Sequence, residues 1–324
     1  MITKLGNTKQ DLAEAAALIR AGELVAFPTE TVYGLGGGNA LDAEASRKIY
    51  AAKGRPSDNP LIVHLTKIED AEKIAYVTDE ARRLYDVFCP GPLTMILNKR
   101  AVVPDTTTGG RQTVAIRFPS HPVARELINL AGVPIAAPSA NKSKHVSPTT
   151  AAHVYADLAG EIPMILEGGD AEVGIESTIV DLTGDAPTVL RPGAITAEDI
   201  KAVLGEGDYY RGEIKEALAP GMKYKHYSPK VPCYLAARES LQSALESLKA
   251  QGLRPVLIAT EETAAEYRPS LSLGSTAKAA QHNIYGVLRE AESYDAAVIE
   301  DLSDRREYFA TMDRIKKATG GNRL

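Results

Sequence analysis

The segment KGRPSDNPL, residues 53–61, places a lysine and an arginine two residues apart on a stretch that can be neither helix nor strand. Gly54 favours the end of a helix at Lys53, and the two prolines bias the residues before them towards extended backbone. Two cations fixed on a stiff bend are suited to holding an anion. They could equally be solvated charges that follow a helix, and the segment alone leaves both interpretations open.

Polar side chains also stand at the ends of several apolar segments, where a buried strand would simply turn. Ligands of α/β sheets bind at strand ends, so these side chains are expected to meet around one cleft. They are Thr29, Glu30, Thr31, Tyr33, Asn59, His64, Thr113, Arg117, Ser139, Asn141, Ser143, Ser147, Ser177, Thr178 and Arg191.

Each of these residues has a structural alternative. Arg117 and Arg191 lie in or beside apolar strands, where an unpaired guanidinium is costly, so each needs an anion from the protein or from a ligand. His64 alone is typical of a hydrogen-bonded core histidine, and Asn141 of a turn former. The run GLGGG, residues 34–38, predicts a flexible turn, because it matches neither the dinucleotide fingerprint nor the P-loop.

Apolar strands interleaved with helices must position these side chains. The pattern predicts a twisted mixed α/β sheet flanked by helices. The expected strands are 24–29, 61–65, 93–98, 113–119, 134–140, 164–169, 177–182 and 188–193, and the expected helices are 8–21, 43–53, 78–88, 120–131 and 149–159.

The pattern of alternating strands and helices changes after Gly193. We expect a catalytic domain over 8–195, an interdomain linker over 196–230 that begins with a helix, and a C-terminal domain over 231–324. Alternating strands and helices in the last segment predict a small Rossmann-like domain with a parallel sheet. It lacks the glycine fingerprint for a dinucleotide, so no cofactor is assigned to it.

Composition limits the class of protein. Hydrophobic residues make up 44% and charged residues 24% of the 324 residues, as in a soluble globular protein, and no apolar run is long enough to span a membrane. Only Cys89 and Cys233 occur, which fits a reducing cytoplasm, and no metal-binding spacing appears. The net charge of −5 weighs against a protein whose main task is gripping nucleic acid.

Seven motifs in one order carry a family resemblance: PTETVYGLG, KGRPSDNPLIVHL, GPLTMIL, VAIRFPSHP, APSAN, GGDAEVGIESTIVDL and LRPG. The chain resembles the YrdC/YwlC family of threonylcarbamoyl-AMP synthases, and PGMKYKHYSP with the segment beyond it resembles the long two-domain form. The resemblance implies an open, positively charged cleft. It also implies a nucleotidyltransferase that converts ATP, L-threonine and bicarbonate into threonylcarbamoyl-AMP, pyrophosphate and water, for tRNA threonylcarbamoyladenosine modification beside the anticodon.

The same resemblance assigns residues. It implies that Lys53 and Arg55 are catalytic and neutralise the phosphates, with Mg²⁺ carried in by ATP and no dedicated protein metal site. ATP is expected to contact Lys53, Arg55, Asn59, Thr113, Ser139, Asn141, Ser147, Arg191, His226 and Tyr227. L-threonine is expected to contact Thr31, His64, Arg117, Ala137 and Ser177. Downstream tRNA threonylcarbamoyl-transferring proteins, and a weak local RNA contact, are the expected partners in the cytoplasm, away from membranes.

One departure and two rival functions stand beside this resemblance. After Ser143 the family commonly has glycine, whereas this chain has Lys144, which adds a cation and removes a residue able to take positive φ. The rivals are an RNA-binding module and a carbamoyl-adenylate-forming enzyme. The RNA-binding module would have an affinity for RNA that falls steeply with salt concentration and does not require threonine. The carbamoyl-adenylate-forming enzyme would use carbamoyl phosphate.

Overall fold

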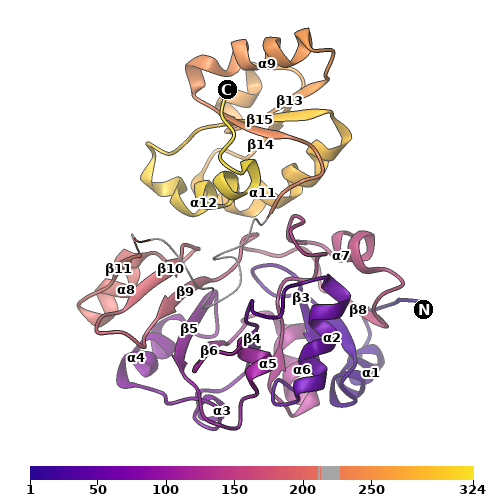
Figure 1. Cartoon of the computed structure of the whole chain (residues 1–324), viewed down its shortest axis with the longest axis vertical. Helices are drawn as coiled ribbons and strands as arrows, with labels where there is room; N and C mark the ends of the chain where they lie inside the picture. The colour runs from indigo at the N-terminus through magenta and orange to yellow at the C-terminus, as the bar shows by residue number, and fades with distance from the viewer. Residues whose placement is uncertain (211, 213–226) are drawn as a thin grey trace. The chain divides into compact units, whose positions relative to one another are not determined.

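The computed structural model describes residues 1–210, 212 and 227–324 (Figure 1). These residues form two compact units. The first comprises Met1–Ser143, Pro148–Glu172 and the described residues that run on from Glu176. The second comprises Lys144–Ser147, Val173–Ile175 and the residues from 227 to the C-terminus. Two short loops of the N-terminal half of the chain are therefore grouped with its C-terminal part.

Two sheets form the centre of the first unit. A mixed seven-stranded sheet has the order β11-β10-β9-β5-β6-β4-β7, and a four-stranded sheet has the order β1-β8-β2-β3. The strands are β1 (Lys4–Gly6), β2 (Leu24–Phe27), β3 (Gly34–Gly37), β4 (Ile62–His64), β5 (Leu93–Asn98), β6 (Thr113–Arg117), β7 (Ile135–Ala136), β8 (Met164–Leu166), β9 (Thr178–Asp181), β10 (Thr188–Arg191) and β11 (Asp208–Tyr209).

Helices connect most of these strands, and most of them begin at a capping side chain. Thr8 and Asp11 form a reciprocal capping box at the start of α1, and Asp42 caps the start of α2. The helices of this unit are α1 (Lys9–Arg20), α2 (Ala43–Lys53), α3 (Ile68–Ala71), α4 (Asp79–Phe88), α5 (Asp105–Thr108), α6 (Pro122–Ala131), α7 (Ala151–Leu158) and α8 (Ala197–Leu204). Through α8 and β11, the first part of the predicted linker adds structure to the first unit.

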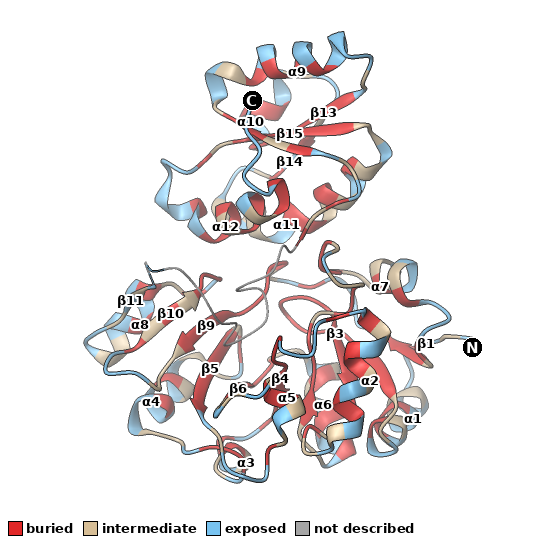
Figure 2. Cartoon of the chain, viewed as in Figure 1, coloured by how far each residue is buried: buried red, intermediate tan, exposed pale blue. Residues whose placement is uncertain are grey.

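The seven-stranded sheet has two different faces, because successive side chains of a strand point to opposite sides. Val63, Met95 and Ile116 are paired across neighbouring strands and belong to the main hydrophobic core. Ile62, Ile96 and Ala115 alternate with them on the other face, in a separate small cluster. Both sets are buried, as the colour of the central strands shows (Figure 2).

The second unit contains a parallel four-stranded sheet in the order β12-β15-β13-β14. Its elements are β12 (Cys233–Ala236), η1 (Arg238–Ser240), α9 (Leu241–Ala250), β13 (Pro255–Ala259), α10 (Glu261–Ala265), β14 (Ser270–Ser272), α11 (Ala277–Glu290), η2 (Ala291–Ser293), β15 (Ala296–Glu300), η3 (Arg306–Tyr308) and α12 (Phe309–Thr319). The mixed sheet of the first unit and this parallel sheet both confirm the predicted fold class.

The prediction of a flexible turn at residues 34–38 was wrong. Gly34–Gly37 is the buried strand β3, paired antiparallel with β2. Glycine is required there by packing: a Cβ on Gly37 would lie 2.3 Å from Ile49 Cγ1, and one on Gly36 would lie 3.0 Å from Ile135 Cγ2. The glycine run therefore lets α2 and β7 pack closely against β3. The local sequence pattern does not predict this packing.

Within the described residues, none of the helices combines the length and the apolar character needed to cross a membrane.

Replacing Gly54 tests the helix end that presents Lys53 and Arg55. Gly54 ends α2 in the left-handed conformation with φ 61°, as its place in the sequence predicts, and open space surrounds its Cα. Gly54→Ala should lower the free energy of unfolding in urea by about 1–2 kcal/mol, because a side chain disfavours positive φ. Gly184→Ala, at an equally open position without positive φ, is the control. Equal stabilities of the two variants would contradict the prediction.

Candidate functional site

A row of polar side chains crosses one face of the seven-stranded sheet. Arg117, at the end of β6, lies directly opposite His64 on β4 and Thr94 on β5. The three side chains therefore point to the same face, beside the small apolar cluster formed by Ile62 and its neighbours. Register places the row at the end of β4 and β6, which is the edge that the sequence predicted.

Arg117 is buried and paired with a carboxylate. Its Nη2 lies 2.9 Å from Glu30 Oε1 and donates a hydrogen bond of 3.3 Å to Thr29 Oγ1. Thr29 Oγ1 in turn lies 3.0 Å from Thr31 Oγ1. Arg117 Nε and Glu30 Oε2 are also buried, and neither has a hydrogen-bond partner among the described residues. A pair of opposite charges with spare polar atoms can bind a small zwitterionic or anionic ligand as well as stabilise the fold.

His64 is held as a neutral ring. Its Nδ1 lies 3.0 Å from the carbonyl oxygen of Ile62, and its ring packs edge-on against Phe27 at 6.0 Å between centroids. Burial, and then the nearby positive charge of Arg117, lowers the pKa of His64 to about 3. At neutral pH the ring therefore serves as a hydrogen-bonding and packing group beside Arg117.

Ser177 joins the polar row to Arg191. Arg191 Nε donates to the Ser177 carbonyl oxygen at 3.0 Å, and Arg191 Nη2 donates to Ser177 Oγ at 3.1 Å. Ser177 Oγ lies 2.7 Å from Thr94 Oγ1. Arg191 is a predicted ATP ligand and Ser177 a predicted threonine ligand, so the two expected subsites meet at this hydrogen bond.

Lys53 and Arg55 are both buried, although Gly54 and residues 56–58 are exposed, which makes the interpretation of the two cations as solvated charges wrong. Lys53 Nζ donates to the carbonyl oxygens of Ser139 and Asn141. Arg55 donates to the carbonyl oxygens of Asn59 at 3.3 Å and Pro60 at 3.2 Å. Burial, and then the charge of Arg55, lowers the pKa of Lys53 well below its usual value.

The APSAN segment connects the bend with the polar row. Ala137 N–H donates to the Ile62 carbonyl oxygen at 2.9 Å, two residues before His64. Ala140 N–H donates to the Tyr33 carbonyl oxygen at 2.8 Å, and Ser143 N–H donates to that of Lys53 at 2.9 Å. These backbone hydrogen bonds connect the APSAN segment and Ser143 with the strand that carries His64, with Tyr33 and with Lys53.

The remaining predicted residues lie in different surroundings. Asn59 is buried with an Oδ1 that has no hydrogen-bond partner in the described part of the chain, and Thr113 starts β6 on the same face as Arg117. Ser147 is buried in a loop grouped with the second unit. Tyr227 also belongs to the second unit, where its ring lies 5.4 Å from that of Tyr285. His226 lies outside the described residues.

Sequence reasoning missed Thr94 as a member of the site, and it noted Glu30 without assigning it a partner or a ligand. Glu30 stands in PTETVYGLG among polar residues that were noted, but nothing in the sequence pairs it with Arg117. Thr94 is a hydroxyl inside the apolar strand LTMILN, and its alternation with Met95 places it on the polar face. That alternation was a usable signal for Thr94. The Glu30–Arg117 pair required the tertiary structure.

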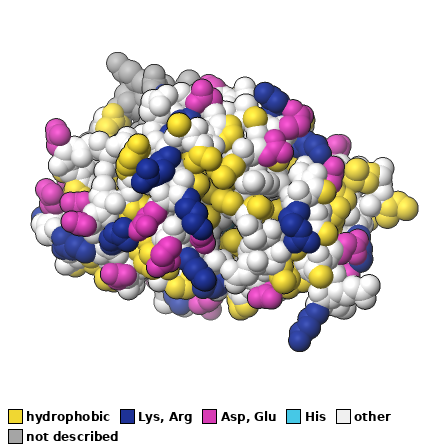
Figure 3. Space-filling model, turned by 90° about the horizontal axis from the view of Figure 1, so that it is seen from below, with side chains coloured by type: hydrophobic (Ala, Val, Ile, Leu, Met, Phe, Trp, Pro, Cys, Tyr) yellow, Lys and Arg dark blue, Asp and Glu magenta, His cyan; other side chains and the backbone are white. Residues whose placement is uncertain are grey.

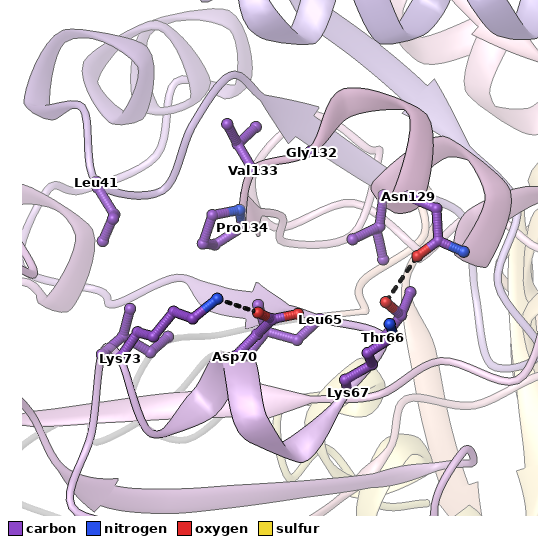
Figure 4. Close-up of a pocket in the computed structure, with 12 residues that line it drawn as sticks. Leu41, Leu65, Thr66, Lys67, Asp70, Lys73, Asn129, Gly132, Val133 and Pro134 are labelled. Atoms are coloured by element: carbon purple, nitrogen blue, oxygen red, sulfur yellow. Dashed lines mark hydrogen bonds and ion pairs between the residues drawn. The ribbon is translucent and has the colours of Figure 1, made fainter.

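A separate pocket of about 280 Å³ is lined by none of the predicted residues (Figure 4). Leu41, Val133 and Pro134 form its apolar side. Asp70 and Lys73 pair across 2.7 Å at its edge, and Thr66 donates to Asn129 Oδ1 at 2.8 Å.

One face of the molecule carries Lys and Arg side chains interspersed with Asp and Glu, around a hydrophobic middle (Figure 3). This face therefore differs from the basic stripe of a nucleic-acid-binding face.

Comparison with known families identifies the chain's class. A family model described as "Telomere recombination", of the Sua5/YciO/YrdC type, matches residues 17–193. A second, described as "Threonylcarbamoyl-AMP synthase, C-terminal domain", matches residues 195–320. The chain belongs to the Sua5/YciO/YrdC family, in its two-domain form.

Similar proteins extend over nearly the whole chain. A threonylcarbamoyl-AMP synthase of Pyrococcus abyssi is 42% identical and covers 94% of this chain and 93% of its own. One of Bacillus subtilis is 42% identical, covering 98% and 95%. The crystal structure of P. abyssi Sua5 complexed with L-threonine superposes with a TM-score of 0.92 at 39% identity, covering 100% of this chain and 98% of that one.

The pKa of His64 predicts a pH dependence of stability. Between about pH 3 and pH 6.5, His64 is protonated in the unfolded chain and neutral in the folded protein. The free energy of unfolding should therefore fall as the pH drops through this range, with a contribution of about 1.4 kcal/mol per pH unit. His64→Gln should lose this contribution in urea unfolding measured at several pH values. The control is His282→Gln, at an exposed histidine. An unchanged slope in His64→Gln would contradict the assignment.

Proposed function

We propose that this protein is an L-threonylcarbamoyladenylate synthase, which forms threonylcarbamoyl-AMP and pyrophosphate from ATP, L-threonine and bicarbonate. The observation that carries the proposal is the near-complete alignment with relatives named for this activity. The buried row of Arg117, His64 and Thr94 supports it, because the chain superposes closely on a relative crystallised with L-threonine. Domain boundaries at 195 and 231, with a linker between them, belong to the same proposal.

L-threonine binds along the polar row in this proposal. Arg117 holds the α-carboxylate through the donor that the protein leaves unused, and Glu30 fixes the guanidinium in the required orientation. Thr31, Ala137 and Ser177 line the rest of the subsite, and neutral His64 supports the position of Arg117. The carboxylate would therefore meet a charge that is already oriented, which lowers the entropic cost of binding.

ATP binds beside this row, on the side of the basic bend. Lys53 fixes the carbonyl groups of Ser139 and Asn141, so the backbone of the nucleotide loop is set before ATP arrives. Carbonyl oxygens accept hydrogen bonds from the Lys53 ammonium, and those of Asn59 and Pro60 accept hydrogen bonds from Arg55. The other proposed nucleotide contacts are Asn59, Thr113, Ser147, Arg191, His226 and Tyr227.

The chemistry proceeds in two steps. The amine of threonine forms a nitrogen–carbon bond with carbon dioxide, releasing a proton, or with bicarbonate, releasing water, to give N-carboxythreonine. Its new carboxylate attacks the α-phosphorus of ATP, and the bond to pyrophosphate breaks. The site's task is to align the two anions and to offset the growing negative charge, which suits Arg55, Lys53 and Arg191.

Mg²⁺ is proposed to enter with ATP and to supply further charge neutralisation on the phosphates. Among the described residues, His, Cys, Asp and Glu side chains form no group of three or more that could hold a metal ion. Its ligands are proposed to be mainly phosphate oxygens. The adenylate is proposed to pass to tRNA-modifying partners in the cytoplasm, with at most a weak local RNA contact by this chain.

Pyrophosphate release separates this function from its rivals. With ATP, Mg²⁺ and bicarbonate, release should require L-threonine. Release that ignores threonine would refute the proposal, and release supported by carbamoyl phosphate would favour a carbamoyl-adenylate-forming enzyme. Arg55→Ala should lower the threonine-dependent rate by about 100-fold or more, as loss of one transition-state donor does.

The control for Arg55→Ala is Arg47→Ala. Arg47 lies on the same helix, α2, but is exposed and paired with Glu44 at 2.8 Å, so its loss should change the rate by less than about twofold. Circular dichroism should show both variants folded. Full activity of the Arg55→Ala variant would show that Arg55 has no catalytic role.

Arg117→Ala tests the threonine subsite. It should raise the KM for L-threonine at least about tenfold, because a charge-assisted hydrogen bond to the carboxylate is lost, while the KM for ATP changes little. The variant also leaves Glu30 buried without its partner. The double variant Arg117→Ala/Glu30→Gln removes that charge and should recover stability while keeping the high KM. A rise in the KM for ATP alone would assign Arg117 to the nucleotide.

A further inference from the structure

One face of α11 contacts three segments that flank the candidate site in sequence. His282, Tyr285 and Arg289 are spaced i, i+3 and i+7, so they lie on the same side of the helix. Their partners are Gly174, Tyr227 and Val146, and all six residues belong to the second unit. We call the side of α11 formed by His282, Tyr285 and Arg289 the α11 face.

Arg289 holds the loop that follows the APSAN segment. Its Nη2 donates a hydrogen bond of 2.5 Å to the carbonyl oxygen of Val146. The chain on either side of this loop is hydrogen-bonded to site residues of the first unit: Ser143 N–H donates to Lys53, and the Pro148 carbonyl accepts from Tyr33 N–H. Covalent continuity therefore transmits any change in the loop to the backbone beside Lys53.

The same loop contains backbone strain. Lys144, with φ 75°, and Tyr227, with φ 62°, are the non-glycine residues with positive φ in the described part of the chain. They are linked, because Ser228 N–H donates to the Lys144 carbonyl oxygen at 3.1 Å. Side chains other than glycine keep such conformations only where their surroundings impose them, and the strain often marks a functional position.

Tyr227 and the 173–175 loop are seated against the same helix. The rings of Tyr227 and Tyr285 are 5.4 Å apart, and the guanidinium of Arg314, from α12, lies 5.7 Å from the centroid of the Tyr227 ring. A Cβ on Gly174 would lie only 2.4 Å from His282 Cα. Gly174 is two residues before Glu176 and three before Ser177.

We propose that the α11 face is a positioning surface for the synthase reaction and that Arg289 is a positioning residue for the nucleotide side of the site. The inference rests on the proposed function. Arg289 keeps Lys144 in its strained conformation and so keeps Ser147 and the backbone next to Lys53 in place for ATP. The C-terminal part of the chain thereby acts on the chemistry without contacting the reacting atoms.

Arg289→Ala is the central test, with kinetic and exchange measurements. The KM for ATP should rise roughly tenfold, because one charged donor to the loop is lost, while the KM for L-threonine should change less than about twofold. Amide hydrogen exchange in a peptide spanning residues 141–150 should become at least about tenfold faster. Arg289→Lys, which keeps a cationic donor, should recover part of both effects.

Arg254→Ala is the matched control. Arg254 lies in the same unit and donates to Asp295 at 3.0 Å, and neither residue belongs to the α11 face or to the loop that Arg289 holds, so its removal tests general weakening of this unit. It should leave both readouts unchanged. A second variant tests the strain: Lys144→Gly added to Arg289→Ala should restore the KM for ATP, because glycine adopts positive φ without support.

The outcomes separate the two proposals. If wild-type protein releases pyrophosphate with threonine but Arg289→Ala leaves the KM for ATP and the exchange of 141–150 unchanged, the positioning role is overturned. The same holds if Arg254→Ala has an equal effect. If adding Lys144→Gly to Arg289→Ala does not restore the KM for ATP, Arg289 does not act by maintaining the strained conformation of Lys144. If wild-type protein shows no threonine-dependent release, the proposed function fails, while the exchange measurement still reports whether Arg289 holds the loop.

Discussion

The ion pair between Arg117 and Glu30 is the interaction on which the site depends. Arg117 ends a strand of the seven-stranded sheet, and Glu30 follows β2 of the four-stranded sheet, so their contact at 2.9 Å ties the two sheets of the first unit together. Both side chains are buried, and removing one partner of such a pair typically costs about 3–5 kcal/mol. The fold therefore cannot relax this contact cheaply, and Thr29, Thr31 and His64 are arranged around it.

The basic bend solves the problem of buried charge in a different way. Lys53 and Arg55 donate to backbone carbonyl oxygens of Ser139, Asn141, Asn59 and Pro60. These carbonyl groups satisfy hydrogen-bond donors with dipoles, whereas Arg117 is paired with the carboxylate of Glu30. In the proposed function the basic bend serves the polyanion, and the Arg117 side serves the smaller ligand that carries its own charge pair.

The loop that follows the APSAN segment is strained where it meets the C-terminal part of the chain. Lys144 and Tyr227 occupy conformations that glycine would adopt freely, and the hydrogen bond from Ser228 to Lys144 connects them. A strained loop has few alternative conformations while its surroundings hold it and many once they are removed. In the proposed positioning role, helix α11 supplies the surroundings that hold this loop.

The sequence by itself determined many of the helices and strands and the types of side chain available to a site. Helix 43–53 and strand 93–98 appear with the predicted boundaries, because capping residues, glycine and alternation are local signals. It also supplied the family, through motifs in order. Only the tertiary structure decided that Glu30 pairs with Arg117, that Lys53 binds carbonyl groups and that GLGG is a buried strand. Those outcomes depend on which segments, far apart in the sequence, pack against one another and exclude solvent or a side chain. A local sequence pattern contains no information about such long-range contacts.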